Sequence, residues 1–79
     1  MSNIEKYNNI FIETFNVDLN SLTDDFTYRS VPVWDSVAHM VLITAIEDTF
    51  DIMLDTNDIL NFTSYNEGKK ILVKYNIEL

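Results

Sequence analysis

The chain has 79 residues, of which 47% are hydrophobic, and its five Lys or Arg against thirteen Asp or Glu give a formal net charge of −8. This length predicts one domain, 1–79, with a small core, and the charge excludes nucleic acid and anionic membrane surfaces as partners, because both would repel it. The absence of Cys and the presence of one His, His39, exclude disulfides, a cysteine nucleophile and the usual zinc sites, so we predict no metal centre.

The first predicted helix begins beside Ser2 and ends near Asn16. Ser2 can accept a hydrogen bond from the first turn while Glu5 reaches back to the Ser2 backbone, an arrangement typical of a capping box. Apolar residues recur at the three- and four-residue spacing of a helix with one buried face. They are Ile4, Tyr7, Ile10, Phe11 and Phe15.

The segment from Val17 to Asp35 shows no helical period and predicts a long loop. Turn-forming residues cluster at 20–21 and 24–25, and the sequence Val31-Pro32-Val33 favours an extended path. A loop of this length inside a small domain needs anchoring by its own side chains. We expect the anchors to be Leu19, Leu22, Phe26 and Trp34.

A second helix is predicted over Ser36–Phe50, with the Asp35 carboxylate capping its first turn. Its core stripe follows a four-residue spacing and consists of Leu42, Ile46 and Phe50. Other apolar residues surround the first half of this helix, and a chain this small cannot bury every side of it. The surface at issue is formed by Val37, Met40 and Val41. We expect it to be either covered by the long loop or exposed as a docking face for a partner.

Acidic residues occupy the end of this helix and the segment after it. Glu47 and Asp48 fall in the last turn, where the helix dipole disfavours negative charge by about 0.3 to 1 kcal/mol, and Asp51, Asp55 and Asp58 follow. No Lys or Arg lies near them in the sequence. The acidic strip is therefore either a solvated surface or a site that a basic partner recognises.

Two further helices complete the predicted fold. A short one covers Asn57–Asn61, capped by Asp55 or Thr56, and the last opens with a second capping-box pattern at 64–67. The predicted inward face of the last helix is Tyr65, Gly68, Leu72 and Tyr75, with Lys69, Lys70 and Lys74 outward. The sequence thus predicts an all-α four-helix bundle with three longer helices, one short third helix and a long loop between the first two helices.

The residues around Ser36 resemble the acyl carrier protein family, which includes peptidyl and aminoacyl carriers. An Asp-Ser pair alone is uninformative, but here it opens a strongly apolar helix after a long loop in an acidic domain of this length. The resembling stretches are Trp34-Asp35-Ser36-Val37-Ala38-His39-Met40, Ala45-Ile46-Glu47-Asp48-Thr49-Phe50 and Phe62-Thr63-Ser64-Tyr65. The likeness extends over the whole chain and implies a bundle of acyl-carrier type.

The resemblance implies that Ser36 is esterified with 4′-phosphopantetheine, which a separate magnesium-dependent transferase donates from coenzyme A. The thiol of that arm would carry an acyl group as a thioester. Independently of the family, a phosphodiester at the start of a helix meets free amides and the positive end of the dipole. Asp35 would position the helix. His39 lies one turn after Ser36 and is either a histidine packed by the loop or, when protonated, a contact for the phosphate. Gly68 either permits close packing or leaves room for an acyl chain.

The docking face that the resemblance implies consists of Val37, Met40, Val41, Thr44, Glu47 and Asp48. Its implied partners are a phosphopantetheinyl transferase, an acyl-activating ligase or acyltransferase, and downstream synthases. Ala38 and Val41 are apolar where fatty-acid carriers usually show acids, so recognition near the arm should depend more on apolar contact. His39 and Met40 after the serine are more similar to discrete carriers of polyketide, surface-polysaccharide or other modified-acyl assembly than to the housekeeping fatty-acid carrier.

Other functions stay open. Within the same chemistry, the chain could carry an aminoacyl group such as D-alanine or a peptidyl intermediate; in another class, it could be an unmodified acidic helical inhibitor or adaptor, which needs no exposed serine. Asp35, Ser36 and His39 can be written as a hydrolase triad, but no oxyanion site accompanies them, and we predict no enzymatic activity. Without an apolar run of roughly 18 residues or a secretory pattern at the amino terminus, we expect a cytoplasmic monomer.

Overall fold

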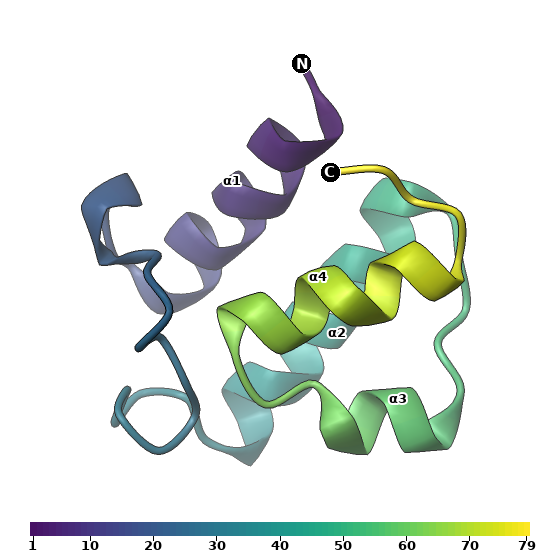
Figure 1. The fold of residues 1–79 in the computed structure, drawn as a ribbon. Coiled ribbons are helices and arrows are strands. Elements are labelled where there is room, and N and C mark those ends of the chain that lie inside the picture. Colours follow the sequence, from purple (N-terminus) through teal and green to yellow (C-terminus); the bar gives the residue numbers. More distant parts are fainter.

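The structure, a computed structural model, describes residues 1–79 and contains only helices and loops. Its elements are α1 (Asn3–Phe15), the 3₁₀ turn η1 (Leu19–Ser21), α2 (Ser36–Phe50), α3 (Thr56–Asn61) and α4 (Tyr65–Lys74). In Figure 1, α4 crosses in front of α2, α1 lies to one side of this pair, and the short α3 lies at its lower edge. The predicted all-α class with a short third helix is confirmed.

Each helix begins where the sequence places a capping side chain. The caps and the amides that donate to them are Ser2 with Glu5 at 3.3 Å, Asp35 with Ala38 at 2.9 Å, Asp55 with Asp58 at 2.9 Å, and Ser64 with Glu67 at 2.9 Å. The predicted capping box of α1 is complete. In α4 only half of it forms, because the Glu67 carboxylate accepts from Lys70 instead of returning to the Ser64 backbone.

Aromatic side chains fill the centre of the domain. The buried rings are Tyr7, Phe11, Phe15, Phe26, Trp34, Phe62 and Tyr65, and α2 contributes Leu42, Ile43 and Ile46. Phe11 lies in the middle of these rings, with centroid distances from 4.9 Å to Tyr7 to 6.4 Å to Phe62. The Tyr7 hydroxyl donates to the Tyr65 carbonyl at 2.6 Å, which joins α1 to α4 inside the core.

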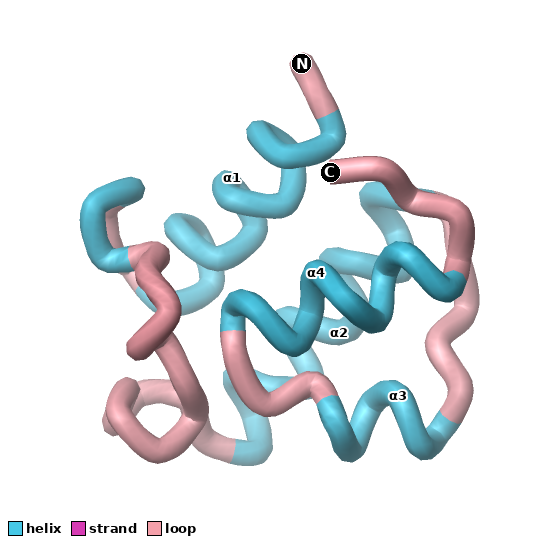
Figure 2. The backbone as a smooth tube through the Cα atoms, in the orientation of Figure 1, coloured by secondary structure: helices cyan, strands magenta, loops and turns pink.

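The long loop between α1 and α2 is anchored by Phe26 and Trp34, as predicted, and Leu22 packs partly against the core. The prediction for Leu19 is wrong: it lies in η1, and 59% of it is exposed. Backbone hydrogen bonds also tie the loop to the connection between α3 and α4, from the Tyr65 amide to the Phe26 carbonyl and from the Tyr28 amide to the Thr63 carbonyl. Figure 2 shows the loop as the largest irregular segment of the chain.

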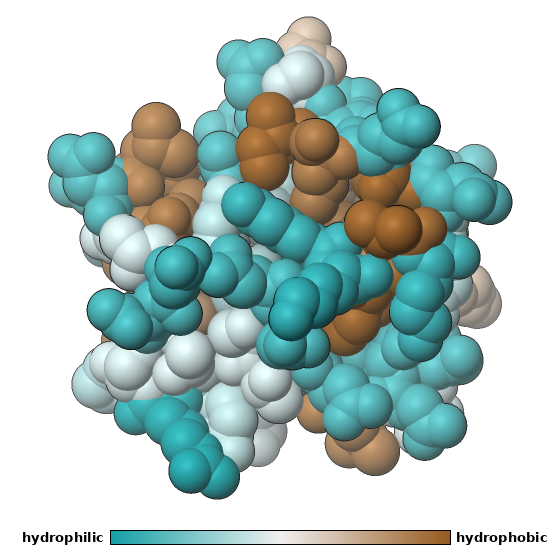
Figure 3. All heavy atoms as spheres, in the orientation of Figure 1, coloured by the Kyte–Doolittle hydropathy of each residue, from teal (hydrophilic) through white to brown (hydrophobic).

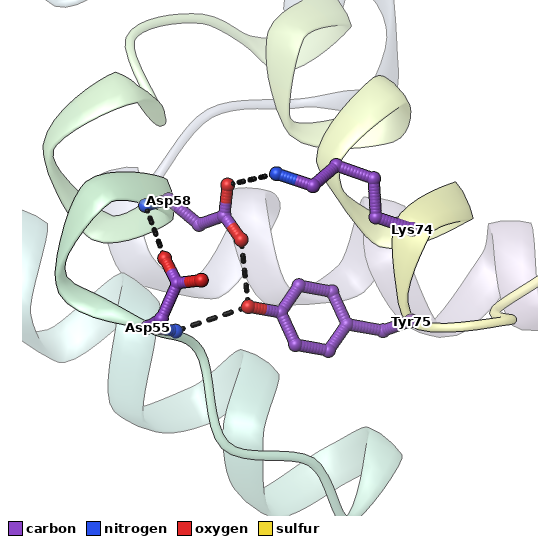
Figure 4. A network of polar contacts seen from close by, with 4 residues as sticks. All are labelled: Asp55, Asp58, Lys74 and Tyr75. Atoms are coloured by element: carbon purple, nitrogen blue, oxygen red, sulfur yellow. Dashed lines mark hydrogen bonds and ion pairs between the residues drawn. The ribbon is translucent and has the colours of Figure 1, made fainter.

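A polar network joins α3 to the end of α4. Asp58 is 3% exposed, and its carboxylate accepts from Lys74 Nζ at 2.5 Å and from the Tyr75 hydroxyl at 2.6 Å. The Tyr75 oxygen also accepts from the Asp55 amide at 3.0 Å, so the four residues form one cluster (Figure 4). The Lys74 side chain is largely exposed, as predicted, but its ammonium also pairs with Asp58 and neutralises the end of the acidic strip.

None of the helices has the length and apolar character needed to cross a bilayer.

Candidate functional site

Ser36 is the first helical residue of α2, and its side chain is exposed. Asp35 Oδ1 accepts from the Ala38 amide at 2.9 Å, and the Asp35 carbonyl accepts from the His39 amide at 2.8 Å. The amides of Ser36 and Val37 have no partner within the protein. The hydroxyl thus projects beside two free N–H groups at the positive end of a helix of 15 residues. These residues fit a phosphodiester on Ser36, because its oxygens would meet donors already in place.

An apolar surface begins at Ser36 and follows the outer side of α2. Val37 is 74% exposed, and Met40 and Val41 are each 52% exposed. Together with Thr44, Ala45 and Asp48 they form a shallow groove on the side of the helix opposite the core. The long loop does not cover this surface, so of the two alternatives left open by the sequence the structure shows the exposed one.

The structure separates Glu47 from this groove. The Glu47 carboxylate is half-buried on the flank of α2, where Oε2 accepts from the Leu54 amide at 2.9 Å. Its position explains why an acid is tolerated in the last turn: the carboxylate caps the backbone of the connection to α3. Of the residues predicted for docking, Glu47 is thus held by an internal contact, whereas Asp48 is exposed at the end of the groove.

A second depression borders Ser36 on its other side, between α2, the long loop and α3. Its walls include Tyr28, Met40, Ile59, Leu60 and Thr63, and Trp34 and Phe62 form its floor. Trp34 and Phe62 are 5% and 0% exposed. Ser36 therefore stands on the ridge between two concave surfaces, both lined largely by apolar atoms.

His39 lies at the inner edge of the second depression, and both of its ring nitrogens bond within the protein. Trp34 Nε1 lies 3.1 Å from His39 Nδ1, and His39 Nε2 lies 2.8 Å from the Ile59 carbonyl oxygen. Because an indole N–H can only donate, Nδ1 accepts and Nε2 carries the proton that it donates to Ile59. His39 thus joins the loop, α2 and α3. The predicted contact with a phosphate on Ser36 would require one of these bonds to break.

The hydrolase triad that the sequence allowed does not assemble. Asp35 bonds to the Ala38 amide, and His39 bonds to Trp34 and Ile59, so neither residue orients the Ser36 hydroxyl. The protein therefore directs no base of its own at the Ser36 oxygen.

The acidic strip divides into internal and external members. Asp58 is buried, and hydrogen bonds from Lys74 and then Tyr75 lower the pKa of its carboxyl below the ordinary value of 3.8. The same contact with Asp58 raises the pKa of Lys74. Asp48 and Asp51 remain exposed without an ionic partner. The exposed acids of the strip are therefore Asp48, Asp51 and Asp55, from the carboxyl end of α2 to the start of α3.

No family model matches the chain, and neither a curated protein nor a solved structure matches it.

One feature of this region was missed by the sequence prediction. The walls contributed by Tyr28, Leu60 and Thr63 come from segments that fold beside Ser36 only in three dimensions. Figure 3, which shows the side of the molecule that carries α4, has hydrophilic residues over the middle of this helix and hydrophobic residues beside them. The exposed apolar residues Val37, Met40 and Val41 all lie within two helical turns of Ser36.

Proposed function

We propose that the protein is an acyl carrier protein that bears a 4′-phosphopantetheine arm on Ser36 and has no catalytic activity of its own. The observation that carries this proposal is the exposed Ser36 hydroxyl beside the two unpaired amides of Ser36 and Val37, at the start of α2. A flexible arm on a rigid helix end has a fixed base and a wide reach. The acyl-carrier type of the bundle is part of the same proposal.

Loading of the arm is a group transfer by a separate phosphopantetheinyl transferase. Ser36 Oγ forms a phosphoester bond to the β-phosphorus of coenzyme A, the phosphoanhydride bond breaks, and the hydroxyl proton passes to a base of the transferase. Adenosine 3′,5′-bisphosphate is the leaving group. When attached, the arm supplies a thiol that holds an acyl group as a thioester. The chain itself contributes the hydroxyl, the free amides and the helix end that present it.

The exposed groove on α2 supports docking of the enzymes that load and use the arm. Val37, Met40 and Val41 offer apolar contact within one to two turns of Ser36, and Asp48 adds charge at the far end. Met side chains adapt to partners of different shape. A transferase, an acyl-activating ligase or acyltransferase, and downstream synthases of fatty-acid-like, polyketide or other specialised biosynthesis are the proposed partners, and their affinity should fall as salt concentration rises.

The test is the intact mass of the folded protein after incubation with coenzyme A, magnesium and a broad-specificity transferase. We expect the parent to gain one phosphopantetheine group and the Ser36→Ala variant to gain none. Ser21→Ala is the matched control, because Ser21 is another exposed serine in a helical turn, and it should be modified like the parent.

A folded parent that gains no mass would contradict the proposal. That result would favour the unmodified acidic inhibitor or adaptor, whose binding would depend on the exposed acids and would be unchanged in Ser36→Ala. If loading succeeds, assays with acyl-activating and aminoacyl-activating ligases separate an acyl carrier from an aminoacyl carrier such as one for D-alanine.

A further inference from the structure

We infer that the group carried by this protein stays outside the helical bundle, which restricts the cargo to short or polar acyl and aminoacyl groups. This inference rests on the proposed function, since it concerns the group that the Ser36 arm would carry. Three observations support it: the aromatic packing of the interior, the filling of the space beside Gly68, and the hydrogen bonds of His39 across the route from Ser36 to the core.

The interior is occupied by rings that lock one another in place. The centroids of Phe11, Phe15 and Trp34 lie 5.0 to 6.0 Å apart, and Phe11 also packs edge to face on Tyr65 at 5.3 Å. Tyr7 is fully buried, and its hydroxyl is bonded to the Tyr65 carbonyl. An acyl chain entering here would have to displace flat, fully buried side chains and break a buried hydrogen bond, because close-packed interiors have no slack of that size.

The space beside Gly68 is already filled. This glycine is the one residue of α4 without a side chain on the inward face, and the sequence left open whether it provides room for a chain. A Cβ atom built there would lie 2.5 Å from Phe62 Cε1 and closer still to Tyr7 Oη and Phe62 Cζ. Gly68 therefore allows the Tyr7 and Phe62 side chains to approach the α4 backbone and provides no tunnel.

Two hydrogen bonds of His39 close the route from Ser36 to the core. The depression next to Ser36 ends on the buried faces of Trp34 and Phe62. At its inner edge His39 accepts from Trp34 and donates to Ile59, and so links the loop, α2 and α3. A chain passing between α2 and α3 would separate these partners and leave a buried indole N–H and a carbonyl oxygen unpaired.

These features select the chemical class of the cargo. Burying a long alkyl chain lowers the free energy in proportion to the apolar area that leaves water. A carrier without an interior site cannot provide this stabilisation. Short acyl groups, and groups with hydroxyl or ammonium substituents, expose little apolar area and therefore need no interior site to be stable in water. The arm with such a cargo would rest on the exposed surfaces on either side of Ser36 and remain accessible to partners.

The test compares acetyl and octanoyl thioesters on the Ser36 arm, loaded by the transferase from acyl-coenzyme A. Neutral hydroxylamine attacks the thioester carbonyl, forms the hydroxamate and releases the arm thiol, and its rate is measured in the folded protein and in urea. The acetyl form is the control for the effect of urea on the reaction itself. We expect the ratio of folded to unfolded rates to be equal for the two cargoes within about twofold. The emission of Trp34, the only Trp of the chain, should also be the same in both forms.

Octanoyl cleavage slowed about tenfold or more in the folded protein relative to acetyl cleavage, with a shift of the Trp34 emission, would overturn the inference. That outcome leaves the proposed function intact, because it requires a loaded arm. Failure of the transferase to load Ser36 at all would instead refute the proposed function, and the inference with it. The two failures are therefore told apart by the intact mass before hydroxylamine is added.

Discussion

Replacing Gly68 by alanine measures how tightly the bundle is packed. In an exposed helix this substitution stabilises by about 1 kcal/mol, because alanine loses less backbone entropy. Here the new methyl carbon would lie 2.5 Å from Phe62 Cε1, with Tyr7 Oη and Phe62 Cζ closer still. Overpacking of a well-filled core costs about 1 to 3 kcal/mol even after relaxation, and contacts this short against two buried rings belong at the upper end of that range.

The net expectation is that Gly68→Ala destabilises the protein by about 1 to 2 kcal/mol. With an unfolding entropy of about 2.1 cal/mol/K per residue over a chain of this size, each kcal/mol corresponds to about 6 °C. Thermal unfolding followed by circular dichroism should therefore show a melting temperature lower by about 6 to 12 °C. Lys70→Ala is the control, because Lys70 lies on the same helix with its side chain 75% exposed; it should stay within about 0.5 kcal/mol of the parent.

A double-mutant cycle identifies the cause. Phe62→Leu removes the ring atoms nearest to the new methyl group, so the cost of Gly68→Ala should shrink by about 1 kcal/mol or more in that background. If Gly68→Ala alone left the protein as stable as the parent, there would be spare volume beside α4. The packing argument, and with it one support for excluding cargo from the interior, would then be refuted.

Three further predictions concern polar contacts. Hydrogen bonds from Lys74 and Tyr75 lower the pKa of Asp58, so its ionised carboxylate stabilises the fold above the pKa of the unfolded chain, and this stabilisation is lost as the pH falls below about 4. Urea titrations should therefore show that the free energy of unfolding of Asp58→Asn and of Lys74→Met falls less steeply in acid than that of the parent. Lys70→Met is the control. Burial, with a smaller effect of Tyr65, raises the pKa of the Tyr7 hydroxyl above its ordinary value of 10.0, so the contribution of Tyr7 to stability is complete below that pH and is lost above it. The melting temperature of Tyr7→Phe should therefore fall less at alkaline pH than that of the parent. An equal fall in both proteins would contradict the assignment of this pH dependence to Tyr7. Asp35→Ala should destabilise the protein by about 1 kcal/mol, whereas Asp35→Asn should be as stable as the parent, because Asn caps a helix as well as Asp does. The measurement is the denaturant midpoint of each variant. An equal loss in both variants would show that the charge of Asp35 matters more than its capping hydrogen bond.

The helices could be predicted from the sequence because their signals are local. Ser2, Asp35 and Ser64 each lie directly before an apolar periodic segment, and the hydrogen bond that they form spans three residues. The exposure of Val37 and Met40 also followed from local information, since α2 is apolar on more sides than a small domain can bury. Ser36 and its outward neighbours were therefore accessible to sequence reasoning.

The remaining contacts depend on segments far apart in the chain. Asp58 and Lys74 are separated by 16 residues, and their pairing needs α3 and α4 to dock first. Nothing in the sequence near Asp58 indicates a cation, which is why the whole strip looked uncompensated. Leu19 shows the opposite error: its hydropathy suggested an anchor, but a residue in a segment without periodicity has no face that the sequence can assign to the core.

The two residues that sequence reasoning placed at the binding surface but that bond internally, His39 and Glu47, have related effects on α2. His39 ties the first turns of the helix to Ile59 of α3, and Glu47 ties its last turn to the Leu54 amide in the connection that leads to α3. Polar contacts on its flanks thus hold both ends of α2. The exposed groove on its outer side takes no part in these contacts. Under the proposed function, a helix fixed in this way would present Ser36 and its apolar groove to a partner without rearranging, so the free energy of association would not be spent on ordering the helix.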